Sequence, residues 1–242
     1  MNIAIDIGNT QIKIGVFEKD AMIHHENFPF EEFPNRIKGL CSRYPIENGL
    51  LSHVARLDPT HLEVLNERVN LLILNNHTPV PFVNRYATPQ TLGVDRIALA
   101  AAASGRFPGQ NVLVIDAGSC ITFEFVNESS EYLGGAISPG IEMRYKAVNA
   151  FTANLPLLTP ADSIPEMADS TDKALHRGIL NGVTCEIDGT IEQYKEENSN
   201  LTVVLTGGDA NFLANQLKSS IFAISNFLLD GLNRILTYNI EE

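Results

Sequence analysis

The sequence predicts an α/β protein built of two similar lobes with a cleft between them. A hydrophobic strand that ends in aspartate and glycine occurs twice, as Ile5-Asp6-Ile7-Gly8 and as Ile115-Asp116-Ala117-Gly118, 110 residues apart. That period is too long for a solenoid repeat and indicates a duplicated domain. The chain has 242 residues, of which 44% are hydrophobic and 19% charged, so it can bury a sizeable core.

The first lobe, residues 1–110, opens with alternating apolar and polar residues. This alternation predicts two strands at 2–7 and 11–17 joined by a turn, with a third strand at 21–28. We expect buried strands at 49–54, 69–74 and 80–83, and helices at 31–43, 59–68 and 94–104.

The second lobe, residues 111–242, repeats this order after a boundary that we place near residue 110. A hairpin over 112–126 is followed by a strand over 134–140 that ends in a turn. The remaining predicted elements are a long helix over 171–195, a strand at 201–206, a turn at Gly207-Gly208, and helices at 209–218 and 226–238.

Composition argues against several classes of protein. The net charge is −12, with 17 basic and 29 acidic residues and no basic cluster, which disfavours a nucleic-acid partner. The sequence contains no run of eighteen apolar residues, which argues against a membrane span. Its N-terminus lacks the basic region of a signal peptide. We therefore expect a cytoplasmic protein without a membrane partner. The 3 cysteines are far apart and suggest neither disulfides nor a zinc site.

The two aspartate hairpins favour a phosphate site. An acidic residue at the end of a buried strand is costly unless something pairs with it, and a cation held for a polyphosphate would do so. Glycine after each aspartate lets backbone amides approach a phosphate. The alternative is a pair of ordinary tight turns. The turn Gly207-Gly208-Asp209 can likewise pass near an adenosine or be a plain glycine turn.

The segment from Tyr86 to Arg96, YATPQTLGVDR, is a turn followed by the start of a helix. Asp95 and Arg96 fall in the first helical turn, where the helix dipole favours anions. The pair could accept a hydroxyl proton and hold a carboxylate. A helix cap with a surface ion pair is the alternative interpretation.

These motifs resemble those of a known superfamily and, more specifically, those of one family within it. The paired hairpins resemble the acetate kinase, sugar kinase, Hsp70 and actin superfamily, which implies duplicated ribonuclease H-like (actin-like ATPase) domains around a nucleotide cleft. Five motifs in order are similar to the type III pantothenate kinases: DxGNT at 6–10, YxxPxxLGxDR at 86–96, DxGTxxT at 116–122, GGxIxPG at 134–140, and a later threonine at 171. Ser119 replaces the threonine of the third motif but keeps its hydroxyl.

The resemblance implies an ATP-dependent pantothenate kinase that makes 4'-phosphopantothenate in the first step of coenzyme A biosynthesis. Asp95 would be the general base. Asp6 would lie near magnesium, and Asp116 would bind a monovalent cation, potassium or ammonium. ATP would contact Asp6, Ile7, Gly8, Asn9, Thr10, Gln11, Ile12 and Lys13 of the first hairpin, and Gly118, Ser119 and Thr122 of the second. Pantothenate would contact Tyr86, Gly93, Val94, Asp95, Arg96 and, from the other subunit of a homodimer, Thr171.

Three other functions stay open on the residues alone. They are a superfamily kinase for another small acceptor, a phosphatase of the same fold, and a regulator that keeps the fold without activity. A kinase for another acceptor should lack the 86–96 motif, and a regulator would be expected to lose one of the three aspartates, Asp6, Asp95 and Asp116. This chain retains all of them.

Overall fold

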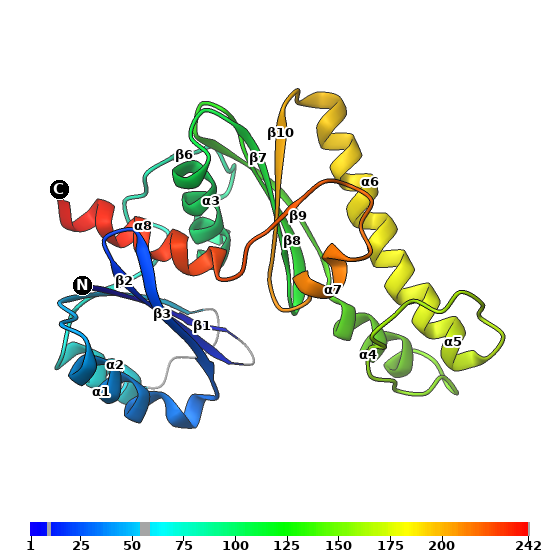
Figure 1. The fold of residues 1–242 in the computed structure, drawn as a ribbon, viewed down its shortest axis with the longest axis horizontal. Coiled ribbons are helices and arrows are strands. Elements are labelled where there is room, and N and C mark those ends of the chain that lie inside the picture. The colour runs from blue at the N-terminus through cyan, green and yellow to red at the C-terminus, as the bar shows by residue number, and fades with distance from the viewer. Residues whose placement is uncertain (9–10, 54–58, 242) are drawn as a thin grey trace. The chain divides into compact units, whose positions relative to one another are not determined.

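The computed structural model describes residues 1–8, 11–53 and 59–241 (Figure 1). Contacts divide the chain into two compact units. The first comprises Met1–Gly109, Ser129–Leu133 and Asn226–Glu242, and the second comprises Gln110–Glu128 and Gly134–Ser225. No helix in the described ranges is long and apolar enough to cross a bilayer.

The first unit is built on a five-stranded sheet in the order β3-β2-β1-β4-β5. Its strands are β1 (Asn2–Ile7), β2 (Ile12–Glu18), β3 (Ala21–Phe28), β4 (Asn48–His53) and β5 (Asn70–Ile73). β1 pairs antiparallel with β2 and parallel with β4. Every residue of β1 is buried, as expected for a strand covered on both faces.

Helices cover both faces of this sheet (Figure 1). α1 (Phe33–Arg43) and α2 (Pro59–Asn66) pack on one face, in a core with the isoleucines of β1 and β2. α8 (Phe227–Glu241) contacts β1 and β4 and packs against α3 (Val94–Arg106). A Cβ at Gly231 would lie 1.9 Å from the Ala98 carbonyl oxygen, so the α3–α8 approach requires glycine.

The second unit contains a sheet in the order β11-β10-β7-β8-β9. Its strands are β7 (Asn111–Ala117), β8 (Cys120–Val126), β9 (Glu131–Pro139), β10 (Leu201–Thr206) and β11 (Phe222–Ala223). Its helices are α4 (Ile141–Ala150), α5 (Thr171–His176), α6 (Gly182–Glu197) and α7 (Ala210–Ala214), and a π-helical turn over Arg177–Asn181 joins α5 to α6. The first two residues of β9 pair with β6 (Val83–Asn84) within the first unit.

Both sheets have one topology. A central strand pairs with an antiparallel hairpin partner on one side and a parallel strand on the other, as β1 does with β2 and β4 and as β7 does with β8 and β10. The strands β1 to β5 of the first unit correspond in sequence order to β7 to β11 of the second. With this matching, the order β3-β2-β1-β4-β5 in the first sheet corresponds to β9-β8-β7-β10-β11 in the second. The predicted duplication is therefore confirmed at the level of strand topology.

Two predicted elements differ from the structure, and one helix was not predicted. The buried strand expected at 80–83 is wrong: only Val83–Asn84 is extended, and both residues are exposed. Prolines at 79 and 81 explain this difference, because proline lacks the N–H that a sheet interior requires. α4 was not predicted, and α7 is shorter than the helix expected at 209–218.

The predicted lobes, 1–110 and 111–242, also differ from the contact-defined units. Residues 129–133 and 226–242 group with the first unit because β6 and α8 pack there. The predicted bounds were placed from the order of elements along the chain. The pairing of β9 with β6 and the packing of α8 in the first unit leave no local signal in the sequence.

Candidate active site

The first aspartate hairpin lies where β1 ends. Asp6 is the penultimate residue of β1 and is buried, with 5% of its surface exposed. It is opposite Lys13 across the hairpin and opposite Ser52 on β4. The Gly8 N–H donates to the Gln11 carbonyl oxygen at 3.2 Å and closes the turn. A carboxylate and an ammonium group thus emerge from neighbouring strands at one end of the sheet.

The remaining residues of this hairpin differ in what they can offer a ligand. Ile7 and Ile12 have buried side chains within the core, so only their backbone groups could contact a phosphate. Gln11 is exposed. Asn9 and Thr10, also predicted to contact ATP, lie outside the described residues.

The second aspartate hairpin repeats this arrangement in the second unit. Asp116 is the penultimate residue of β7 and is opposite Thr122 across the hairpin and Thr206 on β10. The Gly118 N–H donates to the Cys120 carbonyl oxygen at 2.9 Å. Asp116 therefore has the position in β7 that the first aspartate has in β1.

Two hydroxyls of this hairpin have different surroundings. Ser119 is exposed at the tip of the turn. The Thr122 hydroxyl is shielded from solvent and makes no hydrogen bond within the described residues. A buried hydroxyl without a partner is uncommon in folded proteins, so Thr122 marks a position with unused hydrogen-bonding capacity.

A glycine turn after β10 packs directly against the second hairpin. Gly207 has a φ of +98°, and a Cβ there would lie 2.3 Å from the Ala117 carbonyl oxygen and 2.4 Å from Asp116 Oδ1. Only glycine satisfies both the positive φ and the close approach. The Asp209 N–H donates to the Ala117 carbonyl oxygen at 3.0 Å. The turn over 207–209, for which two interpretations were open, is therefore fixed beside the hairpin.

The end of β9 approaches the same hairpin. A Cβ at Gly140 would lie 2.1 Å from the Gly118 carbonyl oxygen, so only glycine fits. The Gly140 N–H donates to the Ser119 carbonyl oxygen at 3.2 Å. Three segments that are distant in sequence thus meet around the turn of the second hairpin.

Arg144 of α4 fixes the end of β9. Its Nε donates to the Pro139 carbonyl oxygen at 2.8 Å and its Nη2 to Ser138 Oγ at 2.8 Å. The same Nη2 forms an ion pair with Glu186 Oε2 on α6 at 2.6 Å. The guanidinium therefore ties the strand end to two helices through charge-assisted hydrogen bonds.

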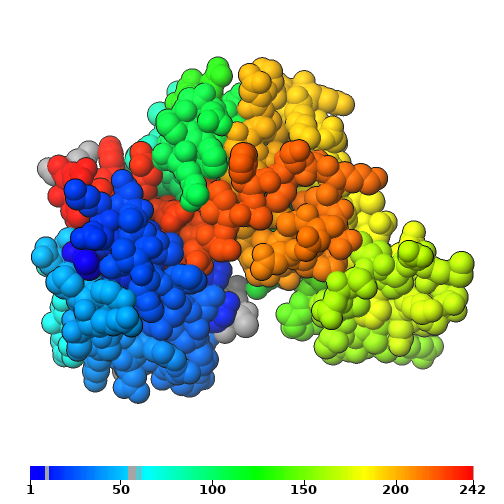
Figure 2. Space-filling model, viewed as in Figure 1, coloured from blue at the N-terminus to red at the C-terminus, as the bar shows by residue number. Residues whose placement is uncertain are grey.

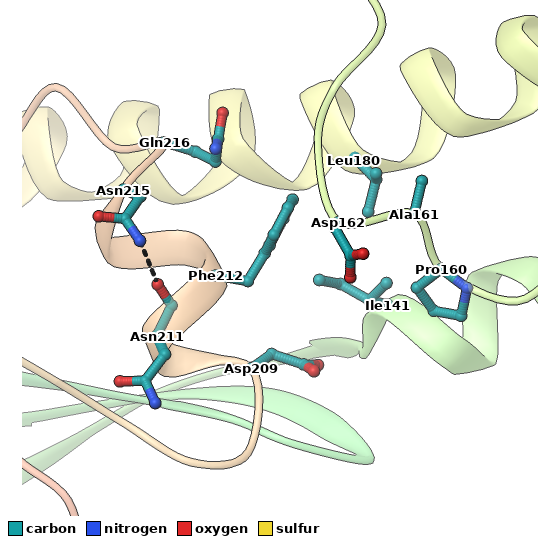
Figure 3. Close-up of a pocket in the computed structure, with 10 residues that line it drawn as sticks. All are labelled: Ile141, Pro160, Ala161, Asp162, Leu180, Asp209, Asn211, Phe212, Asn215 and Gln216. Atoms are coloured by element: carbon teal, nitrogen blue, oxygen red, sulfur yellow. Dashed lines mark hydrogen bonds between the residues drawn. The ribbon is translucent and has the colours of Figure 1, made fainter.

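A pocket of about 370 Å³ opens next to these segments, within the second unit (Figure 3). Its lining combines two carboxylates, three carboxamides, one aromatic ring and four apolar residues: Asp162, Asp209, Asn211, Asn215, Gln216, Phe212, Ile141, Pro160, Ala161 and Leu180. In Figure 3, Asp162 and Asp209 extend from the loop before α5 and from the turn before α7. Burial, and then the nearby Glu142 carboxylate, raise the pKa of Asp209.

The segment that contains Asp95 begins α3 in the first unit. Gly93 is the N-cap residue, and Asp95 Oδ1 accepts a hydrogen bond from the Arg96 N–H at 2.9 Å. A Cβ at Gly93 would lie 2.4 Å from Asp95 Oδ1, so glycine leaves the space that this carboxylate occupies. Within the described residues, the other carboxylate oxygen makes no hydrogen bond.

Arg96 points into the protein. Only 5% of its surface is exposed, and its Nη1 lies 3.5 Å from the Tyr86 hydroxyl. Its guanidinium carbon lies 5.5 Å from the centre of the Tyr86 ring, and that ring stacks on Tyr132 at 6.0 Å. The alternative interpretation, a surface ion pair of Asp95 and Arg96, does not fit the structure, because Arg96 is buried against aromatic rings. Val94 is partly exposed beside it.

The structure brings the predicted residues together in two groups. The first unit holds the first hairpin and the segment 86–96, and the second unit holds Asp116, Gly118, Ser119 and Thr122. Thr171 is exposed at the start of α5, and no hydrogen bond in the described parts of the chain joins it to the second hairpin. Sequence reasoning missed Arg144, whose acceptors are mainly backbone and hydroxyl oxygens without a recognisable motif.

No group of three or more histidine, cysteine or acidic side chains that could hold a metal occurs among the described residues. A single buried carboxylate at Asp6 nevertheless suits magnesium that arrives with a nucleotide. Mg²⁺ in such sites is bound by one or two carboxylates, phosphate oxygens and water rather than by a protein cage.

Comparison with known proteins identifies the family. The sequence model of the type III pantothenate kinases matches residues 2–193. A type III pantothenate kinase of Christiangramia forsetii is 48% identical over 99% of this chain and 99% of its own. One of Flavobacterium johnsoniae is 43% identical over 100% and 99% of the two chains.

Solved structures support the same fold. A Campylobacter jejuni protein assigned to the Baf family of transcriptional activators has a TM-score of 0.65 at 23% identity, covering 99% of this chain and 100% of its own. A glucokinase from an Antarctic psychrotroph has a TM-score of 0.54 at 14% identity over 98% of both chains. The predicted fold class, duplicated ribonuclease H-like domains of the actin-like ATPases, is confirmed by these neighbours and by the repeated sheet topology.

The match over most of the chain and the full-length identity settle the assignment. The chain belongs to the type III pantothenate kinase family, ATP-dependent kinases that phosphorylate pantothenate in the first step of coenzyme A biosynthesis.

Proposed function

We propose that Asp95 is the general base that takes the proton from the primary hydroxyl of pantothenate as the γ-phosphoryl group of ATP is transferred to it. The observation that carries this proposal is the fixed carboxylate. One oxygen of Asp95 is held by the Arg96 amide, and the other is without a hydrogen bond among the described residues. Phosphoryl transfer asks mainly for alignment and charge neutralisation, and a fixed carboxylate supplies alignment.

Arg96 binds the pantothenate in this proposal, together with Tyr86, Gly93 and Val94. Arg96 has only 5% of its surface exposed, and a buried guanidinium interacts strongly with an anion because little water competes with it. Tyr86 contributes both a hydroxyl and a ring face beside the guanidinium. The carboxylate of pantothenate is the group on this substrate that matches such a site.

The two hairpins bind the phosphates of ATP. In the first, Asp6 holds the nucleotide-bound magnesium, Lys13 provides a positive charge, and Ile7 and Ile12 contribute backbone groups alone. Asn9, Thr10, Gly8 and Gln11 complete this hairpin in the proposal. In the second, the tip residues Gly118 and Ser119 offer an amide and a hydroxyl, and Thr122 has an unused hydroxyl.

The pocket beside the second hairpin holds the nucleoside of ATP. Gly207 and Asp209 contact this hairpin and Asp209 also lines the pocket, so a nucleotide with phosphates at the tip could extend into it. Asp209 can accept hydrogen bonds from ribose hydroxyls. The ring of Phe212 and the apolar side chains suit a base.

Asp116 binds a monovalent cation, potassium or ammonium, in this proposal. Asp116 Oδ1 and the Ala117 carbonyl oxygen both face Gly207, since a Cβ there would lie 2.4 Å from the first and 2.3 Å from the second. Hard cations prefer oxygen ligands of this kind.

The family resemblance adds a homodimer in which Thr171 contacts the pantothenate of the neighbouring subunit. Large apolar side chains are exposed between β9 and α5, at Ile137 (63%), Met143 (41%), Phe151 (88%), Leu157 (59%) and Met167 (72%). Figure 2 shows the yellow-green segment around α4 and α5 standing out from the rest of the second unit. Exposed apolar residues in this number support an interface.

The direct test of the activity is phosphorylation of pantothenate by the purified chain with ATP and magnesium, with and without potassium or ammonium. We expect 4'-phosphopantothenate, detected by mass spectrometry, only when potassium or ammonium is present. Asp116→Asn should weaken the response to that cation. Equal rates in sodium alone and in potassium would remove the cation role of Asp116 but leave the kinase activity standing.

Asp95→Asn should lower kcat by about 10²–10⁴-fold, the usual contribution of a general base. The amide is isosteric and can keep the hydrogen bond to the Arg96 N–H, so binding of both substrates should change little. Steady-state kinetics with varied pantothenate measures this effect. Turnover at the wild-type rate would show that another group removes the proton.

Asp209→Asn should raise the KM for ATP about tenfold, because the carboxamide loses the negative charge and one of the two acceptor oxygens that the carboxylate offers to ribose hydroxyls. The KM for pantothenate should stay at the wild-type value. A parallel rise in both KM values would instead indicate general distortion of the second unit.

Co-expression of two inactive variants tests whether Thr171 acts across the dimer. In a heterodimer of Asp95→Asn and Thr171→Glu subunits, one of the two sites has both native residues. A statistical mixture should therefore recover about a quarter of the wild-type activity per subunit, since C2 dimers contain two equivalent sites. No recovery from a mixture that sedimentation shows to be dimeric would place Thr171 in its own subunit's site.

A further inference from the structure

We propose that Asn76 is a positioning residue for phosphoryl transfer: it fixes the turn before α3 and thereby holds Asp95 in place. The proposal rests on the role given above to Asp95. Asn76 follows β5, and its carboxamide Nδ2 donates to two backbone carbonyl oxygens, those of Pro89 and, at 2.9 Å, of Leu92. Leu92 immediately precedes Gly93, the N-cap of α3.

The turn that contains Asn76 is itself firmly attached to the sheet. The Leu74 N–H continues the pairing of β5 with β4 by donating to the Leu51 carbonyl oxygen at 2.9 Å. The Asn75 N–H then donates to Thr78 Oγ1 at 3.1 Å, and the Thr78 N–H donates to the Asn75 carbonyl oxygen at 3.1 Å. Thr78 is buried. These bonds leave Asn76 little freedom to move relative to β4 and β5.

The segment that Asn76 holds has few other hydrogen bonds to the rest of the unit, although the Leu92 side chain is buried. The short 3-10 helix Pro89–Thr91 makes only local hydrogen bonds, such as the one from the Thr91 N–H to the Thr88 carbonyl oxygen at 3.0 Å. Among the described residues, the two bonds from Asn76 are the hydrogen bonds that join residues 87–92 to another part of the chain. The start of α3 is thus linked to the carboxyl end of β5 through one side chain.

The chemistry of asparagine suits this task. A carboxamide nitrogen carries two N–H donors, which match the two carbonyl oxygens, whereas an ionised carboxylate of the same shape has none. Small displacements of a catalytic group are costly, since a shift of about 1 Å can lower the rate about 10²-fold. A loosened turn would therefore reduce turnover more than it reduces stability.

The test compares Asn76→Ala with a matched control, Asn239→Ala. Asn239 on α8 also donates from Nδ2 to two backbone carbonyl oxygens, of Pro79 at 2.9 Å and of Ile235 at 2.8 Å, but among the described residues it makes no hydrogen bond to residues 87–92. Both variants lose two hydrogen bonds from a carboxamide to backbone carbonyl oxygens in the same unit, although one of the Asn239 bonds lies within α8. Only Asn76→Ala should lower kcat for pantothenate phosphorylation, by about 10- to 100-fold, with the KM for ATP unchanged.

Asn76→Asp gives a second readout that a purely structural role would not produce. Its ionised carboxylate repels both carbonyl oxygens, whereas its protonated form can donate one hydrogen bond. The ratio of its kcat to that of the wild type should therefore rise as the pH falls. The corresponding ratio for Asn239→Ala should stay flat.

The outcomes separate this proposal from the proposed function. If the wild type makes no phosphopantothenate, the activity itself fails. If Asp95→Asn is slow but Asn76→Ala, folded by thermal unfolding and circular dichroism, turns over at the wild-type rate, the positioning role alone is overturned. The same holds if Asn239→Ala is slowed equally. If Asn76→Ala is slow while Asp95→Asn is fast, Asn76 does not act through Asp95.

Discussion

The pairing of one central strand on both sides is the constraint on which the rest of each unit depends. β1 is bound by β2 and β4, and β7 by β8 and β10, so neither strand can slide or twist out of its register. The aspartate near the end of each strand is consequently fixed at the middle of the sheet edge. A carboxylate held there needs a cationic or hydrogen-bonding partner. Because the fold is duplicated, the same need arises in both units.

The second hairpin and the segment before α3 are stabilised by different means. In the second unit, Gly140 and Gly207 let two other segments approach the hairpin backbone within distances that any Cβ would prevent. In the first unit, the Asn76 side chain joins the turn before α3 to the end of β5. Gly93 leaves the space that the Asp95 carboxylate occupies. Backbone contact tolerates no substitution, whereas the side-chain link can be weakened by degrees, so the first unit is the better place to separate positioning from folding.

The sequence was informative where a pattern is local. Alternation predicted β1, β2 and β3 almost to the residue, and the repeated aspartate motif predicted two sheets of one topology. It failed where long-range packing decides: α8 joins the first unit because Gly231 meets Ala98, a contact between residues far apart in the chain. Asn76 was missed because its acceptors are backbone carbonyl oxygens, and an asparagine after a strand reads as an ordinary turn residue.

The acidic chain must still bind anionic substrates, and the start of α3 indicates how the two requirements are reconciled. Successive residues of a helix point about 100° apart, so Asp95 and Arg96 cannot point in the same direction. Arg96 is buried against Tyr86, where its attraction for an anion is strong, while Asp95 stays partly exposed and is held by a backbone amide. In the proposed function, one buried cation would do locally what a basic surface does elsewhere, so a net charge of −12 is compatible with binding the carboxylate of pantothenate.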